Sequence, residues 1–357
     1  MNARPRPRTA PDARFSALVA EALAPARLER LSHPEDWPDA APAALPGALW
    51  KAALGALAQD ILGRPGRQFR ARLAELAFRL GDGAGPPPRA LGAIVEIIHA
   101  GSLVIDDIED GSRVRRGQPC LHVRYGTPLA LNAGNWMYFW ALGLVDDLEA
   151  EAPLARGRLH GLVVDAMARC HLGQALDLAV DIADVPRAAV YQTVATSTSL
   201  KTGALTELAA RLGARVAGAP PDREAALARF GRRLGLGLQM LDDLGNLRAD
   251  GGSDKALEDL RNGTPSWPWA LAARGLDDAA FEELQAAARG LRAPVDGDDQ
   301  RARALAAALR MAVGRDGRQQ AAGYLRTALA DLADTVGQRP ELAAVAAEIE
   351  RLEAAYG

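Results

Sequence analysis

Hydrophobic residues recur at helical spacing through most of the chain, and the breaks between these stretches contain Gly and Pro. The pattern predicts helices over about 15–31, 46–62, 67–80, 89–109, 127–149, 153–175, 187–216 and 222–248. A polar, Gly-rich stretch follows over about 250–268, and residues 276–356 contain four or more amphipathic stretches. No stretch alternates in the way that strands do. We therefore expect an all-α protein built as one large helical bundle.

An acidic cluster follows the most hydrophobic of these predicted helices. The helix reads RALGAIVEIIHAGSLVI and runs directly into DDIED at 106–110. Asp106 and Asp110 are one helical turn apart, so they would share a face and repel each other unless a cation neutralises them. Mg²⁺ prefers carboxylate oxygens and often keeps water or phosphate in its other positions. Arg115 and Arg116 come next, and arginine binds phosphate in a bidentate fork. The stretch predicts a metal-bridged diphosphate site.

Composition and charge exclude several classes of protein. With 42 basic and 45 acidic residues and a net charge of −3, the chain gives no reason to expect nucleic-acid binding. The two cysteines form neither a disulfide framework nor a metal-ligand spacing, which favours a reduced, cytoplasmic setting. No hydrophobic run approaches the roughly 20 residues of a membrane span. Residues 1–14, rich in Arg and Pro, predict a disordered tail ahead of one domain over 15–357.

A second acidic doublet resembles the first in its surroundings. The chain has five Asp doublets, but only those at 106 and 242 follow hydrophobic residues where a buried helix face is expected. A charged side chain on such a face needs a partner. Either doublet alone is as consistent with a helix cap as with a site. Two such helices facing each other would hold several Mg²⁺ ions, so the pair favours a functional interpretation.

Together the two motifs resemble those of trans-isoprenyl diphosphate synthases, the polyprenyl synthases. The stretch EIIHAGSLVIDDIED at 96–110, with RRGQP at 115–119 and Tyr125-Gly126, is similar to the first aspartate-rich motif of that family. It is most similar to the geranylgeranyl diphosphate synthase branch. The second motif is LQMLDDLGN at 238–246, where Asn246 replaces the usual Asp. The resemblance implies the all-α isoprenoid synthase fold, with a central cavity between the two Asp-rich helices.

The resemblance also implies roles for the matching residues. About three Mg²⁺ ions would be held by Asp106, Asp107, Asp110, Asp242, Asp243 and Asn246. The allylic substrate would contact Arg115, Lys201, Thr202, Gln239 and Lys255, with Gln239 near its hydrocarbon chain. Isopentenyl diphosphate would contact Arg67, Arg70, His99 and Arg116. Among these, Asp106, Asp107, Arg115, Lys201 and Asp242 would be catalytic. A homodimer is implied by the resemblance alone.

Some of these residues also have a simpler interpretation. An arginine pair such as Arg67 and Arg70 is most often solvated, and a histidine on a hydrophobic helix, such as His99, is most often a core residue with satisfied hydrogen bonds. Cys170 and His171 do not form a metal site, because adjacent helical residues point apart.

Small residues precede the first motif at the positions that set product length in this family. Gly101 and Ser102, with Ile98 one turn earlier, leave the expected tunnel open, which implies a product of about twenty carbons or more. A bulky side chain at these positions, as in Gly101→Phe, should shorten the product. Aromatic residues on the next predicted helix, within NWMYFW at 135–140, could close the tunnel instead.

One departure from the family pattern leaves alternatives open. Thr264 stands where the family usually has a lysine beside the allylic diphosphate. Losing a charge-stabilising group can cost on the order of 10²–10³ in rate. Thr264 and Asn246 therefore keep open a terpene cyclase or an atypical prenyl-transferring enzyme on the same scaffold. A non-catalytic partner subunit is the third alternative, although such a subunit would be expected to have lost the first motif.

Overall fold

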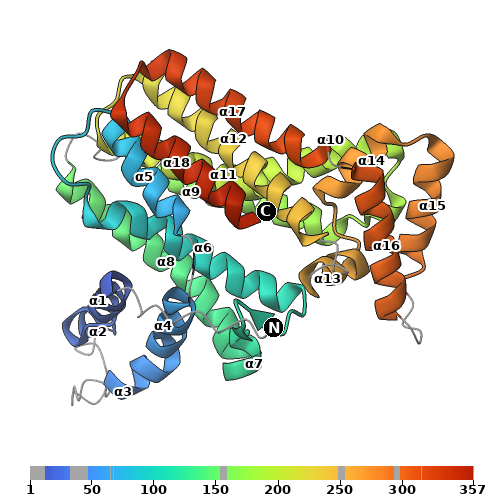
Figure 1. Cartoon of the computed structure of the whole chain (residues 1–357). Helices are drawn as coiled ribbons and strands as arrows, with labels where there is room; N and C mark the ends of the chain where they lie inside the picture. The colour runs from blue at the N-terminus through green and yellow to red at the C-terminus, as the bar shows by residue number, and fades with distance from the viewer. Residues whose placement is uncertain are drawn as a thin grey trace, which may run out of the picture. The chain divides into compact units, whose positions relative to one another are not determined.

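The computed structural model describes residues 13–32, 47–64, 66, 68–152, 159–247, 254–292, 298–314 and 316–356. These residues form helices joined by turns, together with one two-stranded hairpin within the described ranges (Figure 1). The chain divides into two compact units, the first made of 1–68 and 92–150 and the second of 69–91 and 151–357. The prediction of an all-α protein is confirmed. No described helix is both long enough and hydrophobic enough to cross a membrane.

The first unit contains the amino-terminal helices and the acidic cluster. Its elements are α1 (Ala13–Ala22), α2 (Pro25–Ser32), α3 (Gly47–Trp50), the π-helical segment η2 (Lys51–Gly55), α4 (Ala56–Gly63), α6 (Arg89–Glu109) from Gly92 onward, β1 (Val114–Arg115), β2 (Gln118–Pro119), α7 (Leu121–Tyr125) and α8 (Thr127–Glu151). The single helix expected over 15–31 is two helices, because Pro25 starts a new one at its first position. The helix predicted over 89–109 is present with those bounds.

The hairpin between α6 and α7 was not predicted. Its two-residue strands pair antiparallel, with Arg115 opposite Gln118. The turn residues Arg116 and Gly117 have φ angles of 55° and 74°. Positive φ at both central positions belongs to the turn whose twist matches that of the flanking strands. Strands of two residues are too short for an alternating pattern, so the sequence carries no sign of them.

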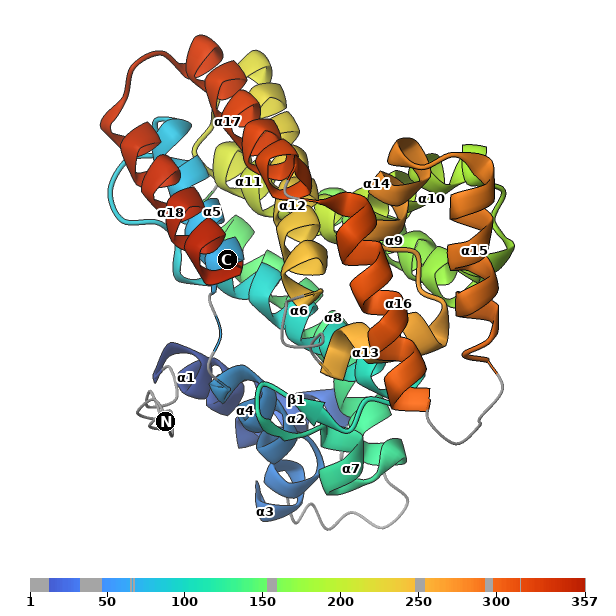
Figure 2. The ribbon, with the colours of Figure 1, turned by 45° about the vertical axis from the view of Figure 1, so that its right-hand side comes forward.

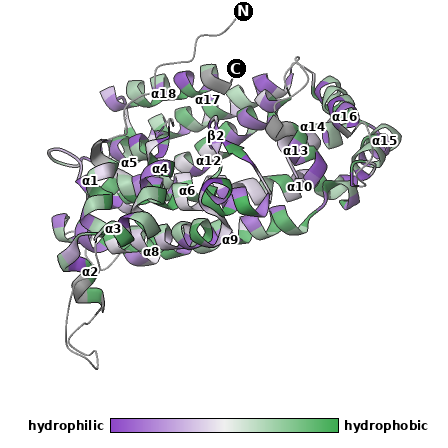
Figure 3. Ribbon diagram, turned by 90° about the horizontal axis from the view of Figure 1, so that it is seen from below, coloured by the Kyte–Doolittle hydropathy of each residue, from purple (hydrophilic) through white to green (hydrophobic). Residues whose placement is uncertain are grey.

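The second unit packs the remaining helices around α11 and α12. Its elements are α5 (Phe69–Leu80), α9 (Leu159–Ala179), the 3₁₀ turn η4 (Ile182–Asp184), α10 (Arg187–Thr198), the π-helical η5 (Ser199–Gly203), α11 (Ala204–Val216), α12 (Pro221–Asn246), α13 (Asp254–Asn262), α14 (Trp267–Gly275), α15 (Asp278–Arg289), α16 (Asp298–Val313), α17 (Asp316–Val336) and α18 (Pro340–Tyr356). Helix α11 packs against α5 and α12, and α12 runs beside α17 (Figure 2). Hydrophobic and hydrophilic residues alternate along α17 and α18, as expected for amphipathic helices (Figure 3).

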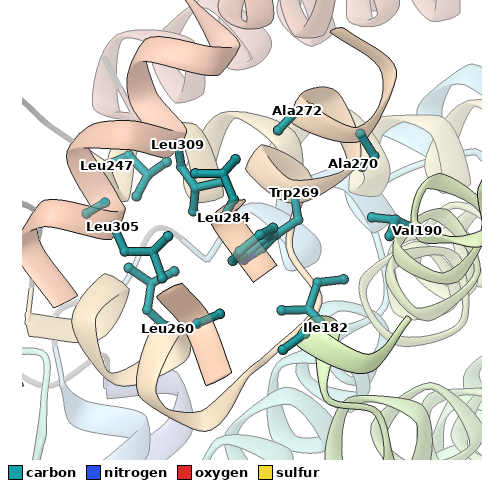
Figure 4. Packing of buried hydrophobic residues seen from close by; sticks show 14 of the residues in the cluster. Ile182, Val190, Leu247, Leu260, Trp269, Ala270, Ala272, Leu284, Leu305 and Leu309 are labelled. Carbon is teal, nitrogen blue, oxygen red and sulfur yellow. The ribbon is translucent and has the colours of Figure 1, made fainter. Parts of the chain in front are cut away.

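A buried cluster in the second unit fixes the helices that follow the second acidic motif. Trp269 of α14 meets Phe281 of α15 edge to face, with ring centroids 6.1 Å apart. Leu257 and Leu260 of α13 join the same cluster, which also includes residues of α10 and α16 (Figure 4). Helix α13 lies within the polar, Gly-rich stretch for which no helix was predicted. Its two leucines, three positions apart, provide the buried face that makes it a helix.

Candidate functional site

The first acidic motif lies at the carboxyl end of α6, where the prediction places it. Asp106 and Asp110 are half-buried, and the backbone N–H of Asp110 donates to the carbonyl oxygen of Asp106 at 2.8 Å, so the helical turn continues through both. Asp107 is only 2% exposed. Carboxylate oxygens one turn apart and partly open to solvent are a donor set that suits Mg²⁺. These side chains are therefore of the chemical kind that Mg²⁺ takes as ligands.

Arg115 is held by one of these carboxylates. Its Nε and Nη2 atoms donate to Oδ1 of Asp107 at 2.8 and 2.5 Å. Burial alone would lower the pKa of Arg115, but the hydrogen bonds and charge of Asp107 outweigh it and raise that pKa above its ordinary value. The cation is therefore fixed beside the acidic cluster. Both hydrogen bonds use Oδ1 of Asp107.

Cys120 lies next to the same carboxylate. Burial, followed by the charge of Asp107 and a hydrogen bond to it, raises the pKa of the Cys120 thiol to about 12. The thiol is fully buried and neutral.

The residues expected around isopentenyl diphosphate are only partly described. Arg116 is exposed at the hairpin turn, and its Nη1 donates to the carbonyl oxygen of Arg64 at 3.4 Å. His99 is half-buried on α6. Arg70 places its guanidinium 4.6 Å from the ring centroid of Phe69 on α5. Arg67 lies outside the described residues.

Gly101 lies where α6 and α8 come closest. A Cβ atom at Gly101 would be 2.9 Å from the carbonyl oxygen of Gly134 and 3.1 Å from Cβ of Met137. The nearest aromatic atom is Cε1 of Tyr138, at 3.4 Å. Any side chain at position 101 must therefore displace the backbone of α8, so Gly101→Phe would disturb folding and would be a poor test of the predicted role in product length. Ser102 is half-buried, which makes it the cleaner position at which to test product length.

Ile98 and Ser102 keep the positions expected of them on α6. Ile98 is 2% exposed, and the hydroxyl of Ser102 donates to the carbonyl oxygen of His99 at 2.9 Å. Trp136 and Trp140 of α8 stack on each other with centroids 5.0 Å apart.

Lys201 lies in the π-helical segment η5 and meets a carboxylate of α9. Its Nζ atom donates to Oδ2 of Asp177 at 3.2 Å, and the hydroxyl of Ser197 donates to Oδ1 of the same residue. Extra residues inserted as a π turn re-aim nearby side chains and occur often at functional sites. The lysine is thus a second cation held by a counter-ion.

The second acidic motif ends α12, and the second aspartate of its doublet, Asp243, accepts a hydrogen bond on each oxygen. Nε2 of Gln239 donates to Oδ1 of Asp243 at 2.7 Å, and the backbone N–H of Trp267 donates to Oδ2 at 2.9 Å. The hydroxyl of Thr202 in turn donates to Oε1 of Gln239 at 3.0 Å. Burial raises the pKa of Asp243 to about 8 despite these two hydrogen bonds. The chain of bonds joins η5, α12 and the start of α14, while Asp242 remains half-buried beside it.

The remaining residues of this motif lie near the ends of helices. Asn246 is the last residue of α12 and is half-buried. Lys255 lies in the first turn of α13, and its side chain is outside the described residues. Thr264 follows α13 and donates its backbone N–H to the carbonyl oxygen of Asp259 at 3.0 Å. Among the residues described, no three acidic, His or Cys side chains already converge as a metal site.

Comparison with known proteins identifies the family. The model of the family described as polyprenyl synthetase matches residues 51–302. The chain belongs to the polyprenyl synthetase family. It is 30% identical over 299 residues to a nonaprenyl diphosphate synthase of Mycobacterium tuberculosis, covering 80% of this chain and 83% of that protein. It is 31% identical over 294 residues to a geranylgeranyl diphosphate synthase of the same organism, covering 82% and 81% of the two chains.

A solved structure agrees with this assignment. The polyprenyl synthase of Caulobacter crescentus, which was crystallised with calcium and isoprenyl diphosphate, matches with a TM-score of 0.68 and 25% identity. The match covers 97% of this chain and 98% of that one. The predicted family and fold are confirmed, as is the prediction of a transferase that makes polyprenyl diphosphates.

Sequence reasoning missed two partners of the site in this polyprenyl synthetase. Asp60 and Arg64, at the end of α4, contact the hairpin that carries Arg115. Their spacing of four residues was a usable signal for an ion pair on one helix face. The backbone N–H of Trp267, which binds Asp243, left no signal because every non-proline residue has such a group.

Proposed function

We propose that the chain is a magnesium-dependent trans-prenyltransferase that condenses an allylic diphosphate with isopentenyl diphosphate. The proposed product is geranylgeranyl diphosphate or a longer trans-polyprenyl diphosphate. The observation that carries the proposal is the arrangement at the end of α6, where Arg115 is fixed on Asp107 beside the half-buried Asp106 and Asp110. A fixed cation and half-buried carboxylates at one helix end suit a diphosphate that arrives with metal ions.

The proposed ligands of about three Mg²⁺ ions are Asp106, Asp107 and Asp110 on α6 and Asp242, Asp243 and Asn246 on α12. Bound Mg²⁺ would neutralise the diphosphate oxygens and make diphosphate a better leaving group. Arg115 and Lys201 would stabilise the negative charge that develops as the allylic carbon–oxygen bond breaks. The hydrophobic residues of α6 ahead of the acidic cluster, such as Ile98, would exclude the water that quenches an allylic cation.

The double bond of isopentenyl diphosphate attacks this cation and forms the new carbon–carbon bond. A proton is then lost from the condensed cation to the released diphosphate, so the reaction needs no dedicated protein base. Arg116 and His99 of the first unit, with Arg67 and Arg70, are the proposed contacts of isopentenyl diphosphate. In support, Arg115 and Arg116 contact different partners, as expected if they serve two different diphosphates.

A homodimer is the proposed assembly. The exposed side chains of α8 include Leu131 and Phe139, which are 42% and 72% exposed. They lie eight positions apart and share a helix face, and an exposed hydrophobic stripe of this kind favours association with a second chain. A cytoplasmic location is proposed because neither cysteine forms a disulfide.

The test is an elongation assay with purified protein and Mg²⁺. Dimethylallyl, geranyl and farnesyl diphosphate are each supplied with and without isopentenyl diphosphate, and the products are separated by chain length. The proposal expects prenyl diphosphates that require isopentenyl diphosphate and disappear with EDTA. A hydrocarbon formed without isopentenyl diphosphate would indicate a terpene cyclase, which Thr264 and Asn246 keep as the second candidate. No product in any arm would favour a non-catalytic partner subunit.

A further inference from the structure

A buried ion pair lies at the end of α4, outside the motifs that carry the proposed chemistry. Nε of Arg64 donates to Oδ1 of Asp60 at 2.8 Å. The two side chains are only 1% and 6% exposed. Burying a guanidinium is costly unless its donors are used, so the partners of its other nitrogens indicate what the pair is for.

Those other nitrogens bind the backbone of the hairpin. Nη1 of Arg64 donates to the carbonyl oxygen of Arg115 at 3.1 Å, and Nη2 donates to the carbonyl oxygen of Pro119 at 2.8 Å. The first carbonyl belongs to β1 and the second to β2. A two-stranded hairpin is marginally stable in water at best, and this one has only two residues in each strand. The guanidinium of Arg64, which is not part of the hairpin, therefore binds both of its strands.

The hairpin carries the two arginines proposed to bind diphosphate. Arg115 extends from β1 to Asp107, while Arg116 occupies the turn with a φ of 55°. The guanidinium of Arg116 donates to the carbonyl oxygen of Arg64 itself. A Cβ atom at Gly66 would lie 2.7 Å from Nη1 of Arg116, so the chain just beyond Arg64 leaves room for that guanidinium. The direction of both side chains thus depends on where Arg64 holds the hairpin.

Asp60 is in turn held in place by α7, the helix that follows the hairpin. Its Oδ2 atom accepts hydrogen bonds from Nη1 of Arg124 at 2.7 Å and from the hydroxyl of Tyr125 at 3.1 Å. Both donors belong to α7, which follows the hairpin directly. The carboxylate has a donor on each oxygen, so the buried pair is anchored at both of its ends.

We propose that Arg64 is a positioning residue, whose buried guanidinium holds the β1–β2 hairpin so that Arg115 and Arg116 are presented to their diphosphates. The inference deepens the proposed function and rests on it, because diphosphate binding by these two arginines is what the positioning serves. Arg64 acts through backbone carbonyl groups and touches no reacting atom. A misplacement of about 1 Å in a positioned group can lower the reaction rate by about 10²-fold. A shift of the hairpin would likewise move Arg115 and Arg116 away from their diphosphates and weaken binding.

The test compares Arg64→Lys with a matched control, Arg124→Lys. The first variant keeps a positive charge beside Asp60, but an ammonium lacks the planar fork that reaches both carbonyl oxygens. The control changes Arg124, the other arginine that binds Asp60. The side chain of Arg124 is 52% exposed. The measurements are the dissociation constant of inorganic pyrophosphate with Mg²⁺ by calorimetry, the KM of each substrate, and amide hydrogen exchange. Because pyrophosphate binding needs no turnover, it reports on Arg64 even if the elongation assay disproves the proposed function.

We expect Arg64→Lys to weaken pyrophosphate binding and raise KM by roughly tenfold or more. Amide exchange should accelerate in the hairpin, residues 114–119, and stay unchanged in α6 and α8. Arg124→Lys should stay within about twofold of wild type, as expected for an exposed ion pair. The double variant with Arg64→Lys and Arg115→Lys should lose less pyrophosphate-binding free energy than the sum of the two single losses. This is expected because both substitutions disturb the same contact, that of Arg115 with the diphosphate. Unchanged pyrophosphate affinity, fully additive losses, or accelerated exchange throughout the first unit would each overturn the proposal.

Discussion

Thr202→Val tests the hydrogen-bonded chain that supports the second acidic motif. The hydroxyl of Thr202 donates to Oε1 of Gln239, whose Nε2 donates to Asp243, whose other oxygen accepts from the backbone of Trp267. Valine keeps the branched shape of threonine and replaces the hydroxyl with a methyl group, which cannot donate a hydrogen bond. The substitution therefore deletes the first link of the chain and leaves the packing of η5 against α12 in place.

The size of the effect follows from the surroundings of each link. Thr202 and Gln239 are both half-buried. Leaving a buried acceptor without its donor costs about 1–3 kcal/mol, and partial exposure places Gln239 at the low end, at about 1 kcal/mol. If the freed amide of Gln239 also turns away from Asp243, a second hydrogen bond, worth about 1 kcal/mol, is lost as well. The expected loss in the free energy of unfolding is therefore about 1–2 kcal/mol.

The effect on function should exceed the effect on stability. Asp243 is a proposed metal ligand, and residues that orient a ligand typically change metal affinity by about 10–100-fold when they are altered. We expect Thr202→Val to raise the Mg²⁺ concentration for half-maximal elongation by about tenfold, with a smaller change at saturating Mg²⁺. The measurements are urea unfolding and a Mg²⁺ titration of the elongation rate.

Two further variants make the result decisive. Thr202→Ser retains the hydroxyl and should stay close to wild type in both measurements. Thr193→Val is the matched control. Thr193 is half-buried like Thr202, but its hydroxyl donates to the carbonyl oxygen of Ala189 on its own helix. Two outcomes would show that the hydroxyl of Thr202 does not position Gln239. One is that Thr202→Val and Thr202→Ser have the same stability and Mg²⁺ requirement, and the other is that Thr193→Val changes these two quantities as much as Thr202→Val does.

Three other predictions follow from the described contacts. Ser102→Phe should shorten the product, because this half-buried position precedes the acidic cluster by one turn, and an unchanged product profile on chromatography would contradict it. In the native protein a thiol reagent should label Cys170 and spare Cys120, because the thiol of Cys120 is buried and has a pKa of about 12. Both cysteines should react in denaturant, and mass spectrometry measures the labelling of each. A hydrogen bond from Arg339, and next one from Arg223, lower the pKa of Asp82 from 3.8 to about 2. The ionised carboxylate of Asp82 therefore stabilises the folded state fully above about pH 4. That effect should disappear as the pH falls towards 2, so the difference in thermal midpoint between wild type and Asp82→Asn should narrow over this range.

The long helices were predictable because each contains several turns of one repeating pattern. The predicted range 89–109 coincides with α6, and 222–248 differs from α12 by one or two residues at each end. The short elements were not predictable for the converse reason. Helix α7 has five residues and each strand of the hairpin has two, which is too few to establish a period.

The site residues were predictable by type and their partners were not. Asp107 and Arg115 were singled out separately from the sequence, and nothing in the sequence pairs them with each other. The partners of Arg64 are two backbone carbonyl groups, and the donor to Asp243 is a backbone N–H. Backbone groups are the same at every residue, so only the fold specifies which of them a side chain meets.

The two described cations proposed for the allylic diphosphate are prepared for binding in the same way. Arg115 is held by Asp107, and Lys201 is held by Asp177, so each cation has already lost side-chain freedom that binding would otherwise cost. A cation fixed in advance stabilises developing charge without reorganising during the reaction. The absent cation at Thr264 therefore does not leave the proposed site without electrostatic support. It makes the reaction depend more heavily on these two pairs, and on the hairpin and π turn that place them.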